Sequence, residues 1–523
     1  MTRSVDEIGA GLAPARGGAP FAPGVRLHVM GVGGTAALGA ALHARALGLD
    51  VTGCDRDLSE ESAAMLITAG VKIVDSEGGD HLDDRTHLEV SKAITSVTPN
   101  HPELVAARTA GIPLLSVQQL IADAAATRGG ALLGVAGTHG KTTSTGWLLA
   151  ALRASGRDPS AFVGGPLNAT DGTPPGSPVH IGAEQGFIVE ADEYGGNFDP
   201  YVADSALILN ADWDHPDIFA DLDAVVATFA AWTRPVLARG VVVINSADRG
   251  GAAIAAALGG SATEAERAQL VTYAVRVHGH DDRNDTASDA SNMTRADVEA
   301  SLIVGERGAV ALGDLRISPR AAALLPVAEA LAGRRLPIGL LGAHNAANAL
   351  GVALLAAANG GSAAGIATAL ASFGGVGRRL EVRFDDGART VLDDYGHHPT
   401  AIRATIETVR ARYPGRHLLL AIEPLTYHRT AALLEPLATA AALADSVVVA
   451  DIFAVRDPDL SISSAGALAA AVARHGVPAT APGSVEAAAD AIAAALPANA
   501  VVLVMGGGRS TLLATRLAGH LGS

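Results

Sequence analysis

One short segment carries two glycines, one lysine and three threonines within seven positions: Gly137, Thr138, His139, Gly140, Lys141, Thr142 and Thr143. It follows an apolar run at residues 131–136 and precedes a helix-like stretch at residues 144–154. A glycine-rich turn between a strand and a helix lets backbone N–H groups surround phosphate oxygens, with the positive end of the helix behind them. A lysine adds a mobile cation for the terminal phosphates, and the neighbouring threonine hydroxyl can hold Mg²⁺. The segment is therefore predicted to bind nucleotide phosphates.

Lys141 is one of three lysines in the chain, with Lys72 and Lys92. Since arginine carries nearly all of the remaining positive charge, a lysine at this position favours a chemical role. The spacing departs from the Walker pattern, which places a glycine five residues before Gly140, where this chain has Val135. A turn followed by a helix cap is the alternative interpretation.

Acidic side chains follow two further strand candidates. Glu190 comes directly after the apolar run 186–189, and Asp214 and His215 follow a strand predicted at 206–210. Carboxylates at the carboxyl ends of buried parallel strands lie where open α/β sheets bind ligands. Mg²⁺ prefers oxygen ligands, so Glu190 is a candidate metal ligand, and His215 either binds metal or orients a carboxylate. A solvated acidic turn is the alternative.

Later segments carry further polar candidates. His344 and Asn345 open an alanine-rich helix, where a helix cap explains one polar residue but not the whole set. Asp394 ends a predicted strand, and His398 lies beside a proline that suits the start of a helix. Arg379 belongs to a short basic pair that either faces phosphate or lies on the surface.

The first strand candidate, at residues 26–30, runs into a second glycine turn with Gly31, Gly33 and Gly34. A helix and another strand follow, and Asp55 stands after that strand. Strand, glycine turn, helix, strand and acid form the outline of a Rossmann-type unit. Two interpretations compete: a nicotinamide site, or a site for the diphosphate of some other nucleotide.

Predicted strands alternate with alanine-rich helices along almost the whole chain. Parallel sheets need such crossover helices, so the pattern predicts α/β domains with parallel sheets. A chain of 523 residues is too long for one core. We expect four parts: a flexible lead-in at residues 1–25, a Rossmann-like domain at 26–128, a central phosphate-loop ATPase domain at 129–376, and a Rossmann-like domain at 377–523. Residues 278–294 are expected to form a polar surface excursion.

Composition excludes several classes of function. The net charge of −16 and the pI near 5.5 argue against binding nucleic acid, which needs a basic surface. The single cysteine, Cys54, rules out an intramolecular disulfide. The first residues lack a secretory apolar core, and no apolar stretch reaches the roughly 18–20 residues of a membrane helix. We therefore expect a cytoplasmic protein that acts on small molecules without a membrane partner.

Taken in order, the motifs resemble those of the Mur ligases, and most closely the family that joins L-alanine to UDP-N-acetylmuramate. The resemblance covers roughly residues 26–520 and rests on these segments: His28–Gly34, Gly137–Thr143, Glu190–Glu193, Asp214-His215, His344–Asn348, Gly375–Arg379, Asp393–Thr400 and Asp451–Ala454. It implies a domain for the UDP-sugar, a central ATPase and a closing C-terminal domain. It also implies ATP-dependent amide bond formation through an acyl phosphate, in peptidoglycan precursor synthesis, by a monomer or homodimer.

The resemblance further implies roles for the candidate residues. Lys141 would stabilise the transferring phosphate, with Mg²⁺ held by Thr142, Glu190 and His215. His344 and Asn345 resemble an adenine-contacting pair, and Arg379 resembles a residue that reaches ATP from the domain junction. Asp394 and His398 would belong to the substrate-facing loop of the closing domain. Gly31, Gly33, Gly34 and Asp55 would bind the UDP-sugar.

The chain departs from the family pattern at residues 423–430, where Tyr427, His428 and Arg429 are expected to meet the incoming amino acid. Glutamate replaces the family's glutamine at position 423, and leucine replaces its histidine at position 425. A ligase that attaches a recycled murein tripeptide to the same UDP-sugar is therefore one alternative. A nucleotide-binding protein that has lost ligase activity is another. An NAD-dependent oxidoreductase is suggested only by the first Rossmann-type unit.

Overall fold

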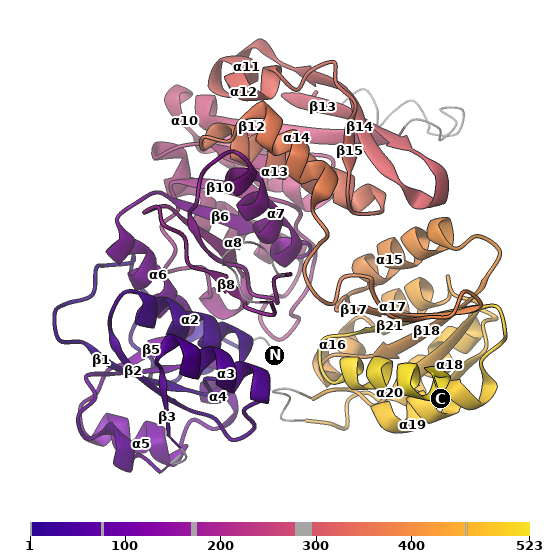
Figure 1. Cartoon of the computed structure of the whole chain (residues 1–523), viewed down its shortest axis with the longest axis horizontal. Helices are drawn as coiled ribbons and strands as arrows, with labels where there is room; N and C mark the ends of the chain where they lie inside the picture. Colours follow the sequence, from indigo (N-terminus) through magenta and orange to yellow (C-terminus); the bar gives the residue numbers. More distant parts are fainter. Residues whose placement is uncertain are drawn as a thin grey trace.

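The structure is a computed structural model, which describes residues 3–74, 78–168, 175–277, 295–454, 457 and 459–522. It consists of three α/β domains, each built on its own sheet (Figure 1). The excursion predicted at residues 278–294 lies outside the described residues. No described helix is both long enough and apolar enough to cross a membrane.

The N-terminal domain has a five-stranded, wholly parallel sheet in the order β3-β2-β1-β4-β5. Its strands are β1 (Arg26–Met30), β2 (Asp50–Cys54), β3 (Lys72–Ile73), β4 (His87–Val90) and β5 (Leu114–Ser116). Its helices are α2 (Thr35–Ala46), α3 (Glu60–Ala69), α4 (Lys92–Val97), α5 (Pro102–Thr109) and α6 (Val117–Arg128), with a 3₁₀ turn η1 (Asp80–Leu82). The order confirms the Rossmann-like arrangement that the sequence predicts.

The described residues before β1 are anchored to this domain, where the sequence predicted a flexible lead-in. A short helix, α1 (Val5–Ile8), contacts α4, and the Thr95 hydroxyl donates to the carbonyl of Ile8 at 2.8 Å. Arg16 forms an ion pair at 2.7 Å with Asp123, a buried residue on α6. The alanine-, glycine- and proline-rich composition indicated flexibility, but these few long-range contacts hold the segment against the domain.

The central domain has a ten-stranded sheet in the order β15-β14-β13-β12-β11-β10-β6-β9-β7-β8. Its strands are β6 (Leu132–Ala136), β7 (Ser160–Phe162), β8 (Val179–His180), β9 (Phe187–Ala191), β10 (Ser205–Ile208), β11 (Val242–Asn245), β12 (Leu270–Val277), β13 (Val298–Val304), β14 (Val310–Ile317) and β15 (Leu336–Ile338). The inner strands are parallel, whereas β8, β14 and β15 add antiparallel edges.

Helices cover both faces of this sheet. They are α7 (Lys141–Ala154), α8 (Leu222–Thr233), α9 (Arg249–Ser261), α10 (Glu264–Gln269), α11 (Pro319–Leu324), α12 (Pro326–Glu329), α13 (Ala343–Ala358) and α14 (Ala363–Ser372), with 3₁₀ turns η2 (Tyr194–Gly196), η3 (Arg234–Ala238) and η4 (Glu306–Gly308). Helix α7 begins at Lys141, directly after the glycine turn, as a phosphate loop requires.

The C-terminal domain has a six-stranded sheet in the order β16-β17-β21-β18-β19-β20, parallel except for β16. Its strands are β16 (Glu381–Asp385), β17 (Arg389–Asp394), β18 (His417–Glu423), β19 (Ser446–Ala450), β20 (Ala479–Gly483) and β21 (Ala500–Gly506). Its helices are α15 (Pro399–Arg412), α16 (Tyr427–Ala432), α17 (Leu434–Ala441), α18 (Ala465–Arg474), α19 (Val485–Ala495) and α20 (Ser510–Gly522).

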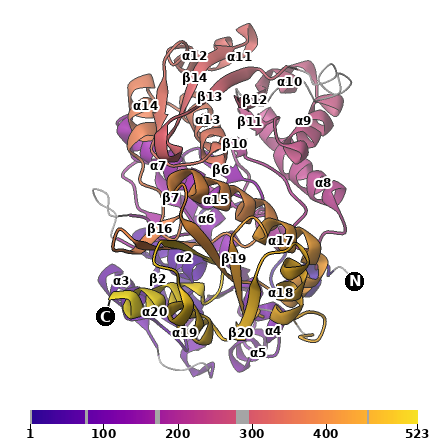
Figure 2. The same ribbon diagram turned by 90° about the vertical axis from the view of Figure 1, so that its right-hand side faces the viewer.

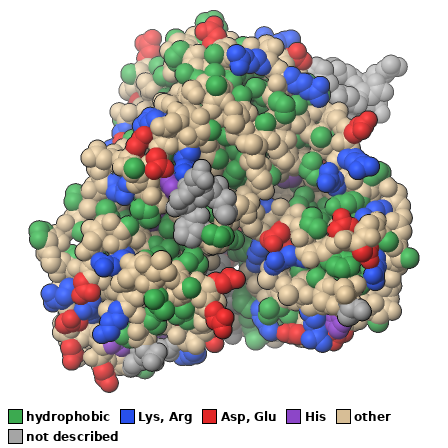
Figure 3. All heavy atoms as spheres, in the orientation of Figure 1, with side chains coloured by type: hydrophobic (Ala, Val, Ile, Leu, Met, Phe, Trp, Pro, Cys, Tyr) green, Lys and Arg blue, Asp and Glu red, His purple; other side chains and the backbone are tan. Residues whose placement is uncertain are grey.

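The domains differ in how they are joined. Buried apolar residues of the N-terminal domain and of one face of the central sheet form one continuous core. Helix α2 lies against β7 and β8, where a Cβ atom at Gly39 would come within 2.8 Å of the Phe162 ring. The C-terminal domain has separate cores, and in Figure 2 it stands in front of the other two domains. On the face shown in Figure 3, basic and acidic side chains are interspersed.

Candidate active site at the junction of the central and C-terminal domains

Sheet order brings the candidate residues of the central domain together. Strand β6, which leads into the glycine turn, pairs with β9 on one side and β10 on the other. The last residue of β6, Ala136, pairs with Ala191 of β9 and Ile208 of β10. The segments that follow these three strands therefore emerge at one edge of the sheet, as predicted for a ligand site.

The loop between β6 and α7 is held by two asparagines. Asn210 accepts the backbone N–H of His139 at 2.8 Å and donates to the His139 carbonyl at 3.0 Å. Gly140 has a φ of 80°, and a Cβ atom there would lie 2.8 Å from the Nδ2 atom of Asn348 on α13. Glycine is needed at this position for both its backbone conformation and the close approach of α13.

Lys141 points into a group of carboxylates. Its Nζ atom lies 3.0 Å from Glu193 Oε2 and 3.2 Å from Asp192 Oδ1. Its side chain is 12% exposed, and that of Glu193 is 1% exposed. Burial acts to lower the pKa of Lys141, but the neighbouring carboxylates outweigh it and raise that pKa. The lysine therefore carries its positive charge at every physiological pH.

Glu190 has the properties of a cation ligand. It accepts a hydrogen bond from the Thr142 side chain, and its buried Oε2 atom has no hydrogen-bond partner among the described residues. Burial raises the pKa of Glu190 to about 7, although Lys141 opposes the shift. A buried carboxylate that resists ionisation and has an unused oxygen is stabilised by a divalent cation. Thr142 and Glu190 therefore fit the Mg²⁺ ion that an ATP site requires.

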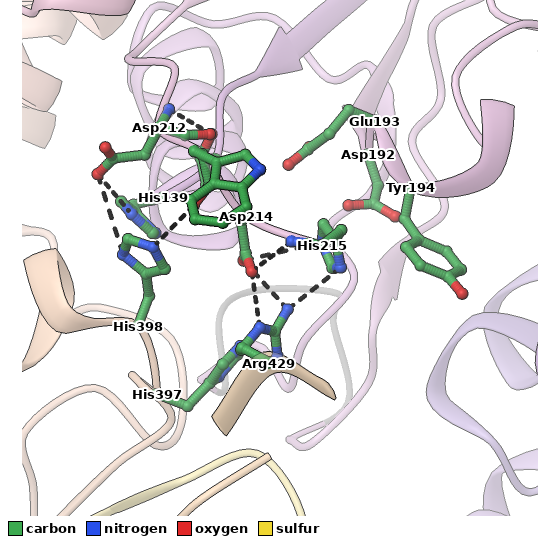
Figure 4. Close-up of polar contacts among 12 residues, drawn as sticks. His139, Asp192, Glu193, Tyr194, Asp212, Asp214, His215, His397, His398 and Arg429 are labelled. Atoms are coloured by element: carbon green, nitrogen blue, oxygen red, sulfur yellow. Dashed lines mark hydrogen bonds and ion pairs between the residues drawn. The ribbon is translucent and has the colours of Figure 1, made fainter. Parts of the chain in front are cut away.

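His215 lies close to Asp192 and Glu193, the carboxylate partners of Lys141. Asp192, Glu193 and His215 each place one ligand atom within 4.8 Å of the others, so they form a second group that could hold a metal ion. The His215 ring lies 4.8 Å from that of Tyr194, centroid to centroid. In the close-up view, Asp192, Glu193 and Tyr194 approach His215 from the turn after β9 (Figure 4).

A buried ion pair joins the central and C-terminal domains beside His215. Arg429 of α16 donates to the Asp214 carboxylate through Nε at 2.6 Å and through a terminal nitrogen at 3.1 Å. The same guanidinium lies 3.2 Å from His215 Nδ1. Burial opposes ionisation of Asp214, but His215 and Arg429 hold its pKa well below the usual range. The pair fixes the closing domain against the residue predicted to bind metal.

A second polar contact crosses the same junction. The Asp212 carboxylate accepts the Thr400 hydroxyl at 2.6 Å and lies 3.3 Å from His139 Nε2, and the His139 and His398 rings lie 4.6 Å apart (Figure 4). Although burial acts against it, hydrogen bonds from His139 and Thr400 hold the pKa of Asp212 at about 2. Burial lowers the pKa of His398 to about 4, so this ring is neutral near pH 7.

The segment that connects the two domains carries Arg379. Its guanidinium lies 5.2 Å from the centroid of the Tyr395 ring, and its charge acts on Glu190 and Asp394. The Asp394 carboxylate accepts backbone N–H groups of Leu380 at 3.0 Å and Gly396 at 2.8 Å. Asp394 therefore shapes the connecting segment through these two hydrogen bonds.

His344 and Asn345 lie in the first turn of α13, beside the phosphate loop. His344 is exposed, and Asn345 donates to the Leu341 carbonyl at 2.8 Å. Asn348, one turn further along α13, contacts Gly140 of the loop. This position next to the loop is suited to a base attached to phosphates that the loop holds.

In the N-terminal domain, Asp55 forms a hydrogen bond with the glycine turn after β1. Gly33 donates its N–H to Asp55 Oδ2 at 2.8 Å, and Gly34 donates to the Gly31 carbonyl at 3.0 Å. The structure thus brings Gly31, Gly33, Gly34 and Asp55 together. Asp55 holds the turn in shape through its Oδ2 atom.

The altered segment after β18 has a structural explanation at its first residue. The Glu423 carboxylate accepts the backbone N–H groups of Arg509 at 3.0 Å and Ser510 at 2.7 Å, at the start of α20. A carboxylate suits the positive end of a helix, so the domain accommodates glutamate at position 423, where the family has glutamine. His428 lies 2.7 Å from Asp457 Oδ1, and the Tyr427 N–H donates to the same carboxylate.

Sequence reasoning left out several residues that organise the site. Glu193 and Asp192, which hold Lys141, were visible as acids after a strand but were not chosen as site residues. Asp214 and Asp212 were visible in the same way, yet their partners Arg429 and Thr400 lie about two hundred positions away. Asp457 had no signal in the sequence.

Each of the three domains matches a known family profile. Three family profiles match in order: the Mur ligase family catalytic domain at residues 26–128, the Mur ligase middle domain at 135–356, and the Mur ligase glutamate ligase domain at 378–508.

Relatives match over nearly the whole chain. The UDP-N-acetylmuramate–L-alanine ligase of Acidothermus cellulolyticus is 32% identical over 494 residues, which cover 93% of each chain. The enzyme of the same name from Mycobacterium marinum is 33% identical over 508 residues, or 95% of this chain and 94% of the relative.

Solved structures share the three-domain fold. The UDP-N-acetylmuramate-alanine ligase of Thermotoga maritima superposes with a TM-score of 0.72 at 21% identity, over 95% of this chain and 99% of its own. A murein peptide ligase from Psychrobacter arcticus gives a TM-score of 0.67 at 24% identity, over 96% of this chain and 99% of its own.

The fold and the junction define a three-domain α/β protein whose glycine turn and Lys141 lie in the central domain, next to residues that contact the C-terminal domain. The family profiles and the relatives, which match almost the full length of the chain, identify its protein family. The chain belongs to the Mur ligase family.

Proposed function

We propose that this protein is an ATP- and Mg²⁺-dependent ligase that joins L-alanine to UDP-N-acetylmuramate in peptidoglycan precursor synthesis. The observation that carries the proposal is the phosphate loop with Lys141 at its end, set beside an unpartnered Glu190 oxygen. The names of the relatives at 32–33% identity support the choice of substrates.

The proposed reaction has two steps. A carboxylate oxygen of UDP-N-acetylmuramate attacks the γ-phosphorus of ATP, and the bond to the β,γ-bridging oxygen breaks, which releases ADP and leaves an acyl phosphate. The neutral amino group of L-alanine then attacks the acyl carbon, the carbon–oxygen bond to phosphate breaks, and inorganic phosphate leaves with one proton lost from nitrogen. Each step moves negative charge, so the site must neutralise charge and align the reactants.

The residues of the chain divide this work. The backbone N–H groups of residues 140–143, at the start of α7, would hold the phosphates, since those of Thr138 and His139 are donated to Asn210. Lys141 would turn from Glu193 and Asp192 toward the transferring phosphoryl group. Thr142, Glu190 and His215 would hold Mg²⁺, which would neutralise part of the phosphate charge. Arg379 would approach from the connecting segment, and His344 and Asn345 would contact the base.

The C-terminal domain would deliver the amino acid. Arg429 already reaches across to Asp214 and His215, and His398 reaches across to His139. The His398 ring is neutral near pH 7, so it adds no positive charge beside the incoming amino acid. Tyr427 and His428 begin the same helix as Arg429 and would line the amino-acid site. Gly31, Gly33 and Gly34, with Asp55 behind them, would hold the diphosphate of the UDP-sugar.

Because its substrates are ATP and a nucleotide sugar, the enzyme would act in the cytoplasm. It would act as a monomer or a homodimer. The retention of Lys141, Glu190 and His215 argues against a protein that binds nucleotide without turning it over.

The test is a substrate-omission assay with the purified full chain. Phosphate should be released only when ATP, Mg²⁺, UDP-N-acetylmuramate and L-alanine are all present, and the product should gain the mass of one alanine residue. The matched comparison replaces L-alanine by glycine, L-serine, or the tripeptide L-alanyl-γ-D-glutamyl-diaminopimelate. Turnover with the tripeptide and none with L-alanine would reject the proposed substrate in favour of the recycling ligase.

A further inference from the structure

Four metal-ligating side chains meet in the N-terminal domain, away from the junction described above. His28 lies on β1, Cys54 ends β2, His81 lies in η1, and Glu103 lies in the first turn of α5. The side chains of His28 and Glu103 are fully buried, whereas that of His81 is 10% exposed. The fold therefore gathers four ligand types from four different elements at one buried point, with His81 on its outer side.

The four side chains point toward one another. His28 Nε2 lies 2.9 Å from Glu103 Oε1 and 3.3 Å from Cys54 Sγ. His81 Nε2 lies 3.1 Å from the same Glu103 oxygen, and Cys54 Sγ lies 3.3 Å from Glu103 Oε2. One ligand atom from each residue lies within 4.8 Å of all the others.

These four separations, 2.9–3.3 Å, are slightly shorter than or equal to the ligand–ligand distances of a tetrahedral shell. With zinc bonds of about 2.0–2.1 Å to nitrogen and oxygen and about 2.3 Å to sulfur, neighbouring ligand atoms stand roughly 3.3–3.6 Å apart. The orientation of His28 agrees with this geometry, because its other ring nitrogen, Nδ1, lies 2.7 Å from the Thr52 hydroxyl. Metal-bound histidines commonly have such a partner, which fixes the ring and leaves the opposite nitrogen free to ligate.

We propose that His28, Cys54, His81 and Glu103 form a structural zinc site in the N-terminal domain. Two imidazole nitrogens, one thiolate and one carboxylate are a tetrahedral set that suits Zn²⁺, whereas Mg²⁺ prefers an all-oxygen octahedron. The thiolate and carboxylate together balance the charge of the ion, so the buried site is neutral. Binding releases the thiol proton of Cys54 to solvent.

The site has a consequence for the neighbouring glycine turn. The Cys54 carbonyl accepts the N–H of Gly31 at 2.9 Å and that of Val32 at 3.0 Å. A metal ligated by Cys54 therefore secures the end of β2 on which the turn after β1 rests. Zinc binding should stiffen the turn without taking part in the ligase reaction.

Cobalt provides a specific test, because Cys54 is the single cysteine of the chain. The full chain, stripped with chelator and titrated with Co²⁺, should show a thiolate-to-cobalt charge-transfer band and the intense visible bands of tetrahedral cobalt. Only Cys54 can supply that charge-transfer band. Zinc should displace the cobalt with a stoichiometry of about one ion per chain. Metal held at the junction by Asp192, Glu193 and His215 would give no such band.

Variants separate ligation from folding. His81→Gln and Cys54→Ser should each weaken zinc binding by more than about tenfold and abolish the rise in melting temperature caused by zinc. The matched control is His87→Gln, a half-buried histidine of the same domain outside the cluster, which should bind zinc like the parent chain. Each variant is compared with its own melting temperature in excess chelator, because His81 and Cys54 also contact Glu103 in the metal-free protein.

The proposal is overturned if the parent chain gives no thiolate band with cobalt at micromolar metal. It is equally overturned if Cys54→Ser and His81→Gln bind zinc as tightly as His87→Gln. Either result would mean that the four side chains form only a hydrogen-bonded network around an ionised Glu103.

Discussion

Replacing Lys141 by methionine tests two roles of this side chain: it compensates the buried charge of Glu193, and it stabilises the transferring phosphate. In the structure its ammonium lies 3.0 Å from Glu193, whose side chain is 1% exposed, and 3.2 Å from the half-buried Asp192. Methionine keeps the apolar stem of the side chain but removes the charge, which leaves Glu193 buried without its cation. Removing one member of a buried ion pair costs about 3–5 kcal/mol.

A second estimate gives the same size. Glu193 can avoid a buried charge by taking up a proton, which at about pH 7.5 costs about 4 kcal/mol for a carboxyl of ordinary pKa. The true cost is somewhat smaller, because burial already raises the pKa of Glu193 despite Lys141. Asp192 adds less than Glu193, since it is partly exposed and ion pairs at the surface contribute only about 0–1 kcal/mol. Lys141→Met should therefore destabilise the nucleotide-free central domain by about 3 kcal/mol.

The double variant Lys141→Met/Glu193→Gln distinguishes the two roles. Glutamine has nearly the same shape as glutamate but no charge, so the stability should return to within about 1 kcal/mol of the parent chain. Turnover should not return, because the cation for the transferring phosphate is still missing, a loss of about 10²–10³-fold. Urea unfolding followed by tryptophan fluorescence is suitable, since the three tryptophans, Trp147, Trp213 and Trp232, all lie in the central domain.

Two results would refute this reasoning. If the double variant is as unstable as Lys141→Met, the loss does not come from an uncompensated buried carboxylate. If either variant turns over at the parent rate, Lys141 does not act on the phosphate.

Three further predictions follow from other contacts. Arg429→Ala leaves Asp214 buried without its cation, so we expect the stability of the domain junction to fall by roughly 3–5 kcal/mol. The loss should appear as faster amide hydrogen exchange in residues 212–215. Unchanged protection of these amides would contradict a stabilising role for the ion pair. Glu423→Gln restores the family residue but should change kcat/KM for L-alanine by less than about twofold, since its oxygens bind the start of α20; a switch to another amino acid would show that Glu423 faces the substrate. Burial lowers the pKa of His43 to about 3, so the unfolded chain takes up a proton below about pH 6.5 while the folded chain stays neutral at this ring. Relative to His43→Gln, the parent chain should lose about 1.4 kcal/mol of stability per pH unit as the pH falls from about 6.5 to 4.5, and parallel stability curves would refute the assignment.

Local patterns predicted much of the fold, because they depend on neighbouring residues. The strand at residues 26–30, the glycine turn after it and the helix that follows occur as the sequence indicated. The same holds for the strand and turn before Lys141, where the helix begins three residues earlier than expected because the threonines belong to its first turn.

Long-range contacts were beyond the sequence. The pairing of Arg429 with Asp214 depends on how the C-terminal domain docks, and nothing local to either residue indicates it. The sequence indicated a mobile cation at Lys141, yet the acids after β9 hold its side chain in a largely buried position. The change at Glu423 suggested altered specificity, whereas its carboxylate is directed at a helix start formed more than eighty residues later.

The central claim is that the junction couples ATP cleavage to amide bond formation on a sugar-linked carboxylate. The most direct measurement uses UDP-N-acetylmuramate labelled with ¹⁸O in its carboxyl group, ATP, Mg²⁺ and L-alanine. The account predicts that one labelled oxygen appears in the released inorganic phosphate for each amide formed, because the acyl phosphate carries that oxygen to phosphorus. Amide formation with unlabelled phosphate, or phosphate release in the absence of the UDP-sugar, would contradict it.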